Sequence, residues 1–433
     1  MMFEQHEGER VRDNVTLPYG DGQLTFHVPE RNLLAVLSPR AVTPSVNEAA
    51  EIRRALQSPI GAPPLALTVQ GARRIVVVAD DMTRLTPVKV ILPILLDELY
   101  AGGVRDDQVR VLIALGTHRP MTESEIVARF GSEVTRRVNV VNSPWQEPGQ
   151  LVDLGTTPNG TPIQVTRQLV EADCIIGVGS VVPHHIPGYS AGAKIIQPGA
   201  TGAMTTGATH FLSTRTRRSY LGVVENPVRA EMEAIAERVG LKAVMNVVLD
   251  TAGRLVQAFY GDPRLAFRTA VELARQVYGV ALPAQADIVI AGSHPCDIEF
   301  WQAHKSLYPA DIAVRQGGTI IVVTPCPEGV AMTHREMLNY TALDADTIQS
   351  LIENGTLGDV ASGALALAWA KVRQRADVSL VSDGISEAEA RALGFTPFAS
   401  LDEAVEAALR KHGPQATATV LTHAPDMLPV LPG

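Results

Sequence analysis

Three histidines and one lysine lie in a glycine-rich stretch of the sequence, residues 177–210. They are His184, His185, Lys194 and His210. Imidazole can serve as an acid, a base or a metal ligand near neutral pH, and an uncharged amine is a nucleophile. The glycines let the backbone approach a ligand more closely than any side chain would allow. These residue types therefore indicate a catalytic or cofactor-binding loop.

Further candidate groups follow two apolar runs that predict buried strands. Asp81 and Arg84 come at the end of the run 74–81, and His118 follows the run 109–115. Ligands of a parallel sheet bind beyond the carboxyl ends of its strands. We therefore expect these side chains to face the glycine-rich stretch, which itself follows an apolar run.

Predicted strands and helices alternate along most of the chain. Strands are expected at 74–81, 109–115, 138–141, 173–178, 287–291, 319–323 and 378–381. Helices are expected at 46–55, 87–101, from Thr122 onwards, 227–239, 263–278, 303–315, 345–353, 361–374, 386–393 and 401–411. This alternation is typical of doubly wound α/β folds.

The sequence predicts two doubly wound α/β domains with the active site in the cleft between them. The boundary is placed near Leu282-Pro283, which gives domains of residues 1–282 and 283–433. A small β hairpin is expected near the N-terminus, because Gly20-Asp21-Gly22 separates two alternating apolar runs.

The composition excludes several classes of protein. The net charge of −9 leaves no basic surplus for nucleic acid. The three cysteines, at 174, 296 and 326, are too far apart to indicate a disulfide framework or a thiolate zinc site. The first residues lack the apolar core of a signal peptide, and no apolar run approaches the roughly 20 residues that span a bilayer. We therefore expect a cytoplasmic protein that binds neither nucleic acid nor membranes.

Four segments together resemble the nickel-dependent lactate racemase family (LarA-like). They are DDMTR (80–84), GTHRPMT (116–122), PHHIPGYSAGAK (183–194) with His210 downstream, and WQAHK (301–305). The combination is specific, whereas any one segment alone would be weak. The resemblance covers the chain from the early hairpin into the second domain.

The resemblance implies a particular cofactor, the nickel pincer nucleotide. This group is a pyridinium-3,5-bisthiocarboxylate mononucleotide whose two arms hold nickel(II). The first domain is expected to bind it, with Lys194 as the covalent attachment point and His210 as the nickel ligand. Cofactor contacts are also expected from Asp81, Met82, Thr83 and Arg84.

The resemblance also implies a racemase or epimerase of a small, lactate-like 2-hydroxy carboxylate. His118 and His184 would be the acid/base pair, while Arg84, Gln302 and Lys305 would bind the substrate. Reversible hydride transfer to a pyridinium avoids a carbanion beside a carboxylate, and the planar keto acid can be reduced on either face. The expected partners are the 2-hydroxy acid and the enzymes that make the cofactor; a homodimer is an open alternative for the assembly.

Two other functions are compatible with the same residues. His118, His184 and His210 could ligate zinc in a hydrolase, or the protein could only bind or carry a nucleotide-like cofactor. Taken singly, His118 would be interpreted as a helix cap and His210 as a solvated residue at the start of a helix. His185 is interpreted as a turn residue, because the spacing to Lys194 favours His184 over His185 as the acid/base residue.

Overall fold

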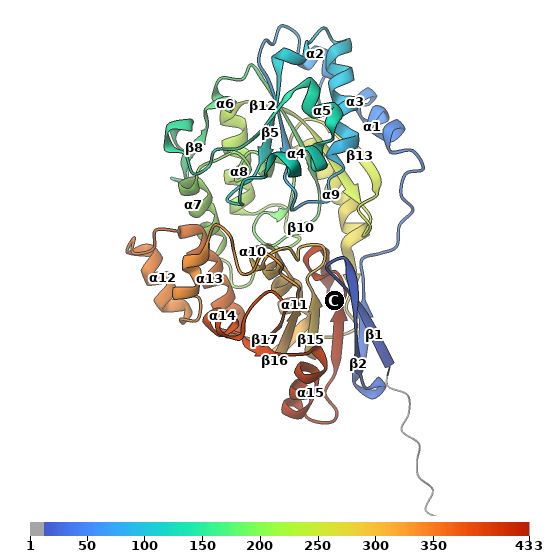
Figure 1. Cartoon of the computed structure of the whole chain (residues 1–433), viewed down its shortest axis with the longest axis vertical. Coiled ribbons are helices and arrows are strands. Elements are labelled where there is room, and N and C mark those ends of the chain that lie inside the picture. Colours follow the sequence, from blue (N-terminus) through green and yellow to red (C-terminus); the bar gives the residue numbers. More distant parts are fainter. Residues whose placement is uncertain (1–12, 433) are drawn as a thin grey trace, which may run out of the picture.

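Residues 13–432 are described by a computed structural model, in which two α/β domains lie one above the other (Figure 1). The first twelve residues, which are not expected to form a signal peptide, lie outside this range. The first domain is built on a six-stranded sheet of order β13-β12-β9-β4-β5-β6. Its strands are β4 (Ile75–Asp80), β5 (Val109–Ala114), β6 (Asn139–Asn142), β9 (Cys174–Ser180), β12 (Leu241–Leu249) and β13 (Leu255–Gly261).

Helices cover both faces of this sheet, because its central strands are apolar on both sides. In β4, Val77 packs with one hydrophobic cluster and Val76 and Val78 pack with another. The first face carries α1 (Glu48–Gln57), α3 (Val88–Ala101), α4 (Glu123–Phe130) and α5 (Ser132–Arg137). The second face carries α8 (Pro227–Val239), and α7 (Ala203–Ser213) packs against α8. The helix α9 (Leu265–Tyr278) packs against β12 and β13.

The second domain repeats this plan with a six-stranded sheet of order β18-β17-β16-β15-β19-β3. Its strands are β3 (Leu33–Leu37), β15 (Ala286–Gly292), β16 (Val314–Val323), β17 (Asp377–Val381), β18 (Thr396–Phe398) and β19 (Ala418–Leu421). On one face lie α11 (Leu307–Ala313) and α13 (Val360–Arg373), with α12 (Ala345–Glu353) packed on α13. The other face is covered by α15 (Leu401–His412). The two-domain α/β prediction is confirmed.

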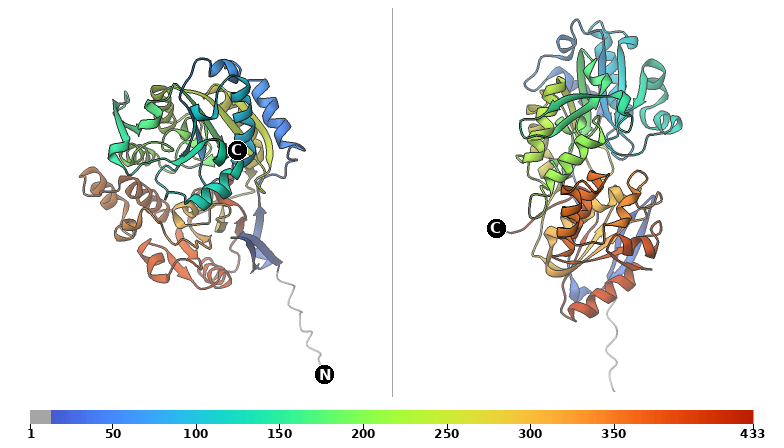
Figure 2. Two further views of the ribbon diagram at one scale, coloured as in Figure 1. Left: turned by 45° about the horizontal axis from the view of Figure 1, so that its top comes forward. Right: turned by 90° about the vertical axis from the view of Figure 1, so that its left-hand side faces the viewer.

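The early hairpin is confirmed, but it packs with the second domain. Strands β1 (Asp13–Tyr19) and β2 (Gly22–Val28) are antiparallel, and Leu17 and Phe26 join the core around β15 and β16. The next strand, β3, pairs in parallel with β19 at the edge of the second sheet. In Figures 1 and 2 the hairpin accordingly lies beside the C-terminal elements. The assignment of all residues up to 282 to the first domain is therefore wrong for residues 13–37.

Most predicted helices are confirmed, and one needs correction. For α8, Asn226 accepts a hydrogen bond from Arg229 N, and Gly240 ends the helix with a φ of +83°. The helix predicted at 303–315 is instead interrupted by a 3-10 turn at His304–Ser306, between α10 (Phe300–Ala303) and α11. It ends at Ala313, because residues from Val314 onwards form β16. Among the described residues, none of the helices is long and apolar enough to cross a membrane.

Two glycines with similar backbone angles offer a test of how tightly the glycine-rich stretch is packed. Gly188 has a φ of +84°, and a Cβ there would lie 2.0 Å from the carbonyl oxygen of Val223. Gly160 has a φ of +87° but no atom within 4 Å of such a Cβ. We expect Gly160→Ala to lower the free energy of unfolding by about 1 kcal/mol, through backbone strain alone.

Gly188→Ala should cost about 3 kcal/mol or more, because the clash with the backbone adds to the strain. Denaturant unfolding of both variants and the parent measures the difference. Equal losses in the two variants would contradict the close packing of Gly188.

Candidate active site

The candidate site lies where the strand order of the first sheet reverses. From β4 the chain adds β5 and β6 on one side and later β9 and β12 on the other. Ligands of doubly wound sheets bind beyond the carboxyl ends of the strands at such a point. A cavity of about 780 Å³, part of it open to solvent, occupies this position. Residues from both domains line it, as expected for a site in the interdomain cleft.

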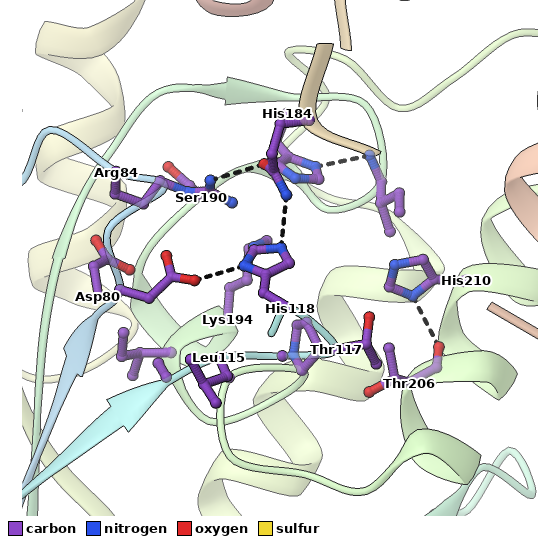
Figure 3. Close-up of a pocket in the computed structure, with 18 of the residues that line it drawn as sticks. Asp80, Arg84, Leu115, Thr117, His118, His184, Ser190, Lys194, Thr206 and His210 are labelled. Carbon is purple, nitrogen blue, oxygen red and sulfur yellow. Dashed lines mark hydrogen bonds and ion pairs between the residues drawn. The ribbon is translucent and has the colours of Figure 1, made fainter. Parts of the chain in front are cut away.

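The glycine-rich stretch forms most of one wall of this cavity. After β9, a short hairpin pairs β10 (Pro183–His184) with β11 (Gly188–Tyr189), and a 3-10 turn, Gly192–Ile195, then carries Lys194. His210 follows near the end of α7 and is only 9% exposed. It is therefore neither solvated nor at a helix start. Figure 3 shows His118, His184, Lys194 and His210 around one space.

His118 is held by a carboxylate on one side and an amide on the other. Its Nδ1 lies 2.6 Å from Asp81 Oδ2, and its Nε2 lies 2.8 Å from Gln302 Nε2. Hydrogen bonds from His118 and Thr83 and the charge of Arg84 more than offset the effect of burial and hold the pKa of Asp81 well below its usual value. Ionised Asp81 accepts the Nδ1 proton, so Nε2 presents a lone pair to the Gln302 amide. The structure thus brings together residues more than a hundred positions apart.

His184 presents the opposite ring atom to its protein partner. Its Nδ1 accepts a hydrogen bond from the backbone N–H of Ile186 at 3.2 Å, so its proton is on Nε2. Burial lowers the pKa of His184 well below its ordinary value, and the nearby cations Lys305 and Arg84 add to the effect. His184 is therefore a neutral imidazole at physiological pH.

Burial also favours the uncharged forms of Lys194 and His210. Burial and the charges of Arg84 and Lys305 hold the pKa of Lys194 well below its ordinary value. Burial lowers the pKa of His210 to about 4, and its Nδ1 donates to Thr206 O at 2.8 Å (Figure 3). The Nε2 lone pair of His210 is consequently available to a ligand. A free amine and a free imidazole nitrogen line the same cavity.

Gln302 connects two cations to His118. Its side-chain oxygen accepts hydrogen bonds from Lys305 Nζ and from Arg84 Nη1, the latter at 3.3 Å. Its amide nitrogen is thereby turned towards His118. Burial lowers the pKa of Lys305 to about 8, with Arg84 adding to the effect. A region with these cations and an amide donor suits a carboxylate.

The other two predicted contact residues lie farther from the main cavity. Thr83 donates from its hydroxyl to Asp81 Oδ1 at 2.6 Å and accepts from Arg84 Nη1 at 2.9 Å. The Met82 side chain packs against the hydrophobic core of the first sheet. Neither residue lines the 780 Å³ cavity, whereas Asp80, Asp81 and Arg84 do.

An aromatic stack beside His184 was missed by the sequence analysis. The ring of His185 lies parallel to those of His184 and Tyr308, with centroids 4.6 Å and 3.9 Å away, and edge-on to His304. His185 is in the turn between β10 and β11, as expected, and it also lines the cavity. Trp301 lines it as well. The pair of adjacent histidines was the sequence signal for this stack. The contact with Tyr308 could not be predicted, because it forms only where the two domains pack together.

The zinc alternative finds no support in the geometry. Within residues 13–432 no three His, Cys, Asp or Glu side chains are placed to hold one metal ion. His118, moreover, has its two ring nitrogens bonded to Asp81 and Gln302.

A buried arginine holds the glycine-rich stretch in position. Arg229, on α8, is 1% exposed and lies over the ring of Phe267. It donates to Pro187 O at 3.3 Å, to Ala191 O at 3.1 Å and to Tyr189 O. All three residues are buried, so the guanidinium supplies hydrogen bonds that water would otherwise have to provide; Ala191 O accepts a second one from Lys194 N.

Comparison with known proteins gives a consistent result for both domains. Residues 19–222 match the family described as the lactate racemase N-terminal domain, and residues 281–430 match the lactate racemase C-terminal domain. A lactate racemase of Thermoanaerobacterium thermosaccharolyticum is 32% identical over 323 residues, which cover 73% of this chain and 75% of that protein. A lactate racemase of Lactiplantibacillus plantarum is 27% identical over 427 residues, covering 96% and 99%.

Two solved structures are similar to this chain over most of its length. The lactate racemase apoprotein of Thermoanaerobacterium thermosaccharolyticum superposes with a TM-score of 0.87 at 26% identity, over 96% of this chain and 100% of that one. A Thermotoga maritima protein gives a TM-score of 0.72 at 20% identity, over 90% and 100%, which is a similarity of fold.

Removal of the Arg229 side chain tests its role in the loop. Arg229→Met keeps an apolar stem but removes the guanidinium hydrogen bonds to three carbonyl oxygens. We expect the free energy of unfolding to fall by about 3 kcal/mol or more, measured by denaturant titration. Arg391→Met, at a site 64% exposed in a surface ion pair, is the control and should change it by less than about 0.5 kcal/mol. Similar small losses in both variants would contradict the role.

Proposed function

The chain belongs to the lactate racemase family and is a racemase, and from this premise we propose that it inverts C2 of a 2-hydroxy carboxylate with a nickel pincer nucleotide bound at Lys194. The observation that carries the proposal is that a lysine amine and a histidine nitrogen line one cavity. They are the Lys194 amine and His210 Nε2, and burial favours the uncharged form of each. An uncharged amine can be acylated, and a neutral imidazole can ligate nickel.

The residues of the cavity fit this cofactor. Its soft thio-acyl sulfurs and a histidine nitrogen form a donor set suited to nickel. His210 would supply the protein ligand, and Lys194 would form the amide-type bond. Asp81 and Arg84, at the carboxyl end of β4, would hold the polar part of the group. When bound, the cofactor would accept the hydrogen of C2 as a hydride and return it to either face.

The two catalytic histidines would handle the proton of the substrate hydroxyl. His118 presents a lone pair at Nε2, where Gln302 now donates, so a hydroxyl that displaces this amide would meet a base. Asp81 stabilises the imidazolium that forms. His184 carries its proton on Nε2 and can donate a hydrogen bond to the substrate oxygen. To act as the base for the other enantiomer, His184 must move this proton to Nδ1 and give up its bond from Ile186.

Arg84 and Lys305 would bind the substrate carboxylate. Both cations hydrogen-bond to Gln302 and line the cavity. A carboxylate placed there would leave its C2 near His118, because Gln302 contacts all three side chains. Desolvation strengthens such charge-assisted bonds. We further propose that separate enzymes make the cofactor and deliver it to this site.

Intact mass and metal content test the proposed attachment. Protein produced together with the cofactor-forming enzymes should gain the mass of one cofactor and one nickel. Lys194→Ala should lose both, because the amine that forms the bond is gone. Lys242→Ala, at an exposed position, is the control and should keep both. Unmodified parent protein despite a confirmed cofactor supply would contradict the proposal.

The pH dependence of kcat/KM tests the substrate site. The pKa of Lys305 is about 8 in the folded protein, lowered by burial, so this cation is lost as the pH rises through 8. We expect kcat/KM for the hydroxy acid to fall about tenfold per pH unit above pH 8, because this parameter reports the free enzyme. Lys305→Arg should extend the plateau to higher pH, since arginine stays protonated. A profile flat to pH 10 in the parent would exclude this role.

A further inference from the structure

A second cavity adjoins the proposed carboxylate site on the side away from Lys194. It has a volume of about 490 Å³, part of it open to solvent, and shares Arg84, His184 and Lys305 with the first cavity. Its walls are mostly apolar and include Val182, Leu249 and Pro295. A substrate held at Arg84 and Lys305 would therefore have this cavity beside it.

This cavity lies at the reversal point of the second sheet. The strand order changes direction between β15 and β19, so the segments after these two strands meet beyond their carboxyl ends. Cys296 and Lys305 follow β15, and Pro425 and Asp426 follow β19. Binding sites form at such positions in doubly wound sheets. The second domain thus contributes a binding position of its own, facing that of the first.

Two carboxylates line the second cavity, and only one lacks hydrogen-bond partners. Asp250 is occupied, because it accepts from the backbone nitrogens of Ala252 and Arg254 and from the Arg254 side chain. Asp426 has no side-chain hydrogen bond to any residue in the range 13–432, although its backbone N–H bonds to His423 O. A carboxylate in a mostly apolar wall is stabilised by a ligand that donates to it.

The charges around Asp426 limit what that donor can be. Lys305 and Arg84 line the same cavity, and His294 lies close enough to act on the carboxyl electrostatically. An ammonium group beside these cations would be repelled. A second carboxylate would be repelled by Asp426 itself, because burial raises its pKa to only about 6 and it is ionised at neutral pH. Neutral hydroxyl groups satisfy both conditions.

Resting on the proposed racemase function, we propose that the second cavity is a subsite for the chain beyond C2 and that the substrate is a polyhydroxylated 2-hydroxy acid, an aldonic acid. Asp426 accepts hydrogen bonds from hydroxyl groups of the chain, while Arg84 and Lys305, which line both cavities, hold the carboxylate. Lactate would leave this cavity without an occupant, since its methyl group cannot reach across the space.

Two acids with the same carbon skeleton test the subsite. Gluconate and 2-hydroxyhexanoate both have six carbons, and they differ in the hydroxyl groups beyond C2. We expect the cofactor-free, full-length protein to bind gluconate roughly tenfold more tightly in calorimetry, as one hydrogen bond to a charged acceptor would provide. The cofactor-loaded enzyme should show at least the same preference in kcat/KM, with the C2 epimer of gluconate as product.

Variants of Asp426 distinguish the effect of its hydrogen-bond acceptor on binding from the effect of the cavity's shape. Asp426→Leu should reverse the preference, with 2-hydroxyhexanoate bound more tightly, and Asp426→Asn should reduce it severalfold. Glu406→Gln, in a surface pair 63% exposed, is the control and should leave the preference unchanged. Circular dichroism confirms that each variant is folded, and Asp426→Asn provides the test if the leucine variant is not.

The outcomes distinguish this inference from the proposed function. Equal binding of the two acids, or a preference that survives in both Asp426 variants, would overturn the subsite even if lactate is racemised. A loaded enzyme that inverts no hydroxy acid, while gluconate still binds through Asp426, would instead overturn the racemase mechanism. Stronger turnover of a dicarboxylate such as malate than of gluconate would also overturn the assignment of Asp426.

Discussion

The structure depends on basic side chains that are largely withdrawn from water in the cleft between its domains. Arg84, Lys194 and Lys305 line one cavity of a protein whose net charge is −9. Desolvation disfavours the charged form of each lysine, so the pKa of Lys305 falls to about 8 and that of Lys194 falls well below its ordinary value. The cleft therefore combines an amine whose uncharged form is favoured with cations that attract an anion.

The folding of the two sheets explains why these groups meet. Each sheet reverses its strand order at one point, and the segments beyond β4, β9, β15 and β19 converge. The first domain contributes His118, His184 and Lys194 to the cavity, and the second contributes Gln302 and Lys305. Packing holds this arrangement closely, because Arg229 binds the carbonyls of the glycine-rich stretch and Gly188 lies against the backbone of Val223. The site is thus built from backbone geometry as much as from side chains.

The fold and much of the site could be predicted from the sequence, for identifiable physical reasons. Buried parallel strands are continuous apolar runs, and helix α8 is marked by Asn226, Pro227 and Gly240. By contrast, β3 is short and at a sheet edge, so its pairing with β19, far along the chain, left no local signal. The stacking of His185 on Tyr308 and the exposure of Asp426 to a cavity likewise arise only when the domains meet. Sequence indicates which residues can react, whereas the shape of the substrate site comes from tertiary packing.

The fate of the hydrogen on C2 tests the central claim most directly. A cofactor-loaded sample would be incubated with one enantiomer of the substrate in D2O until racemisation is complete, and the products examined by NMR and mass spectrometry. If the hydrogen moves as a hydride between substrate and cofactor, both product enantiomers should keep protium at C2, because solvent does not exchange with it. Incorporation of deuterium at C2 in step with racemisation would show proton abstraction by a side chain, and would contradict the account.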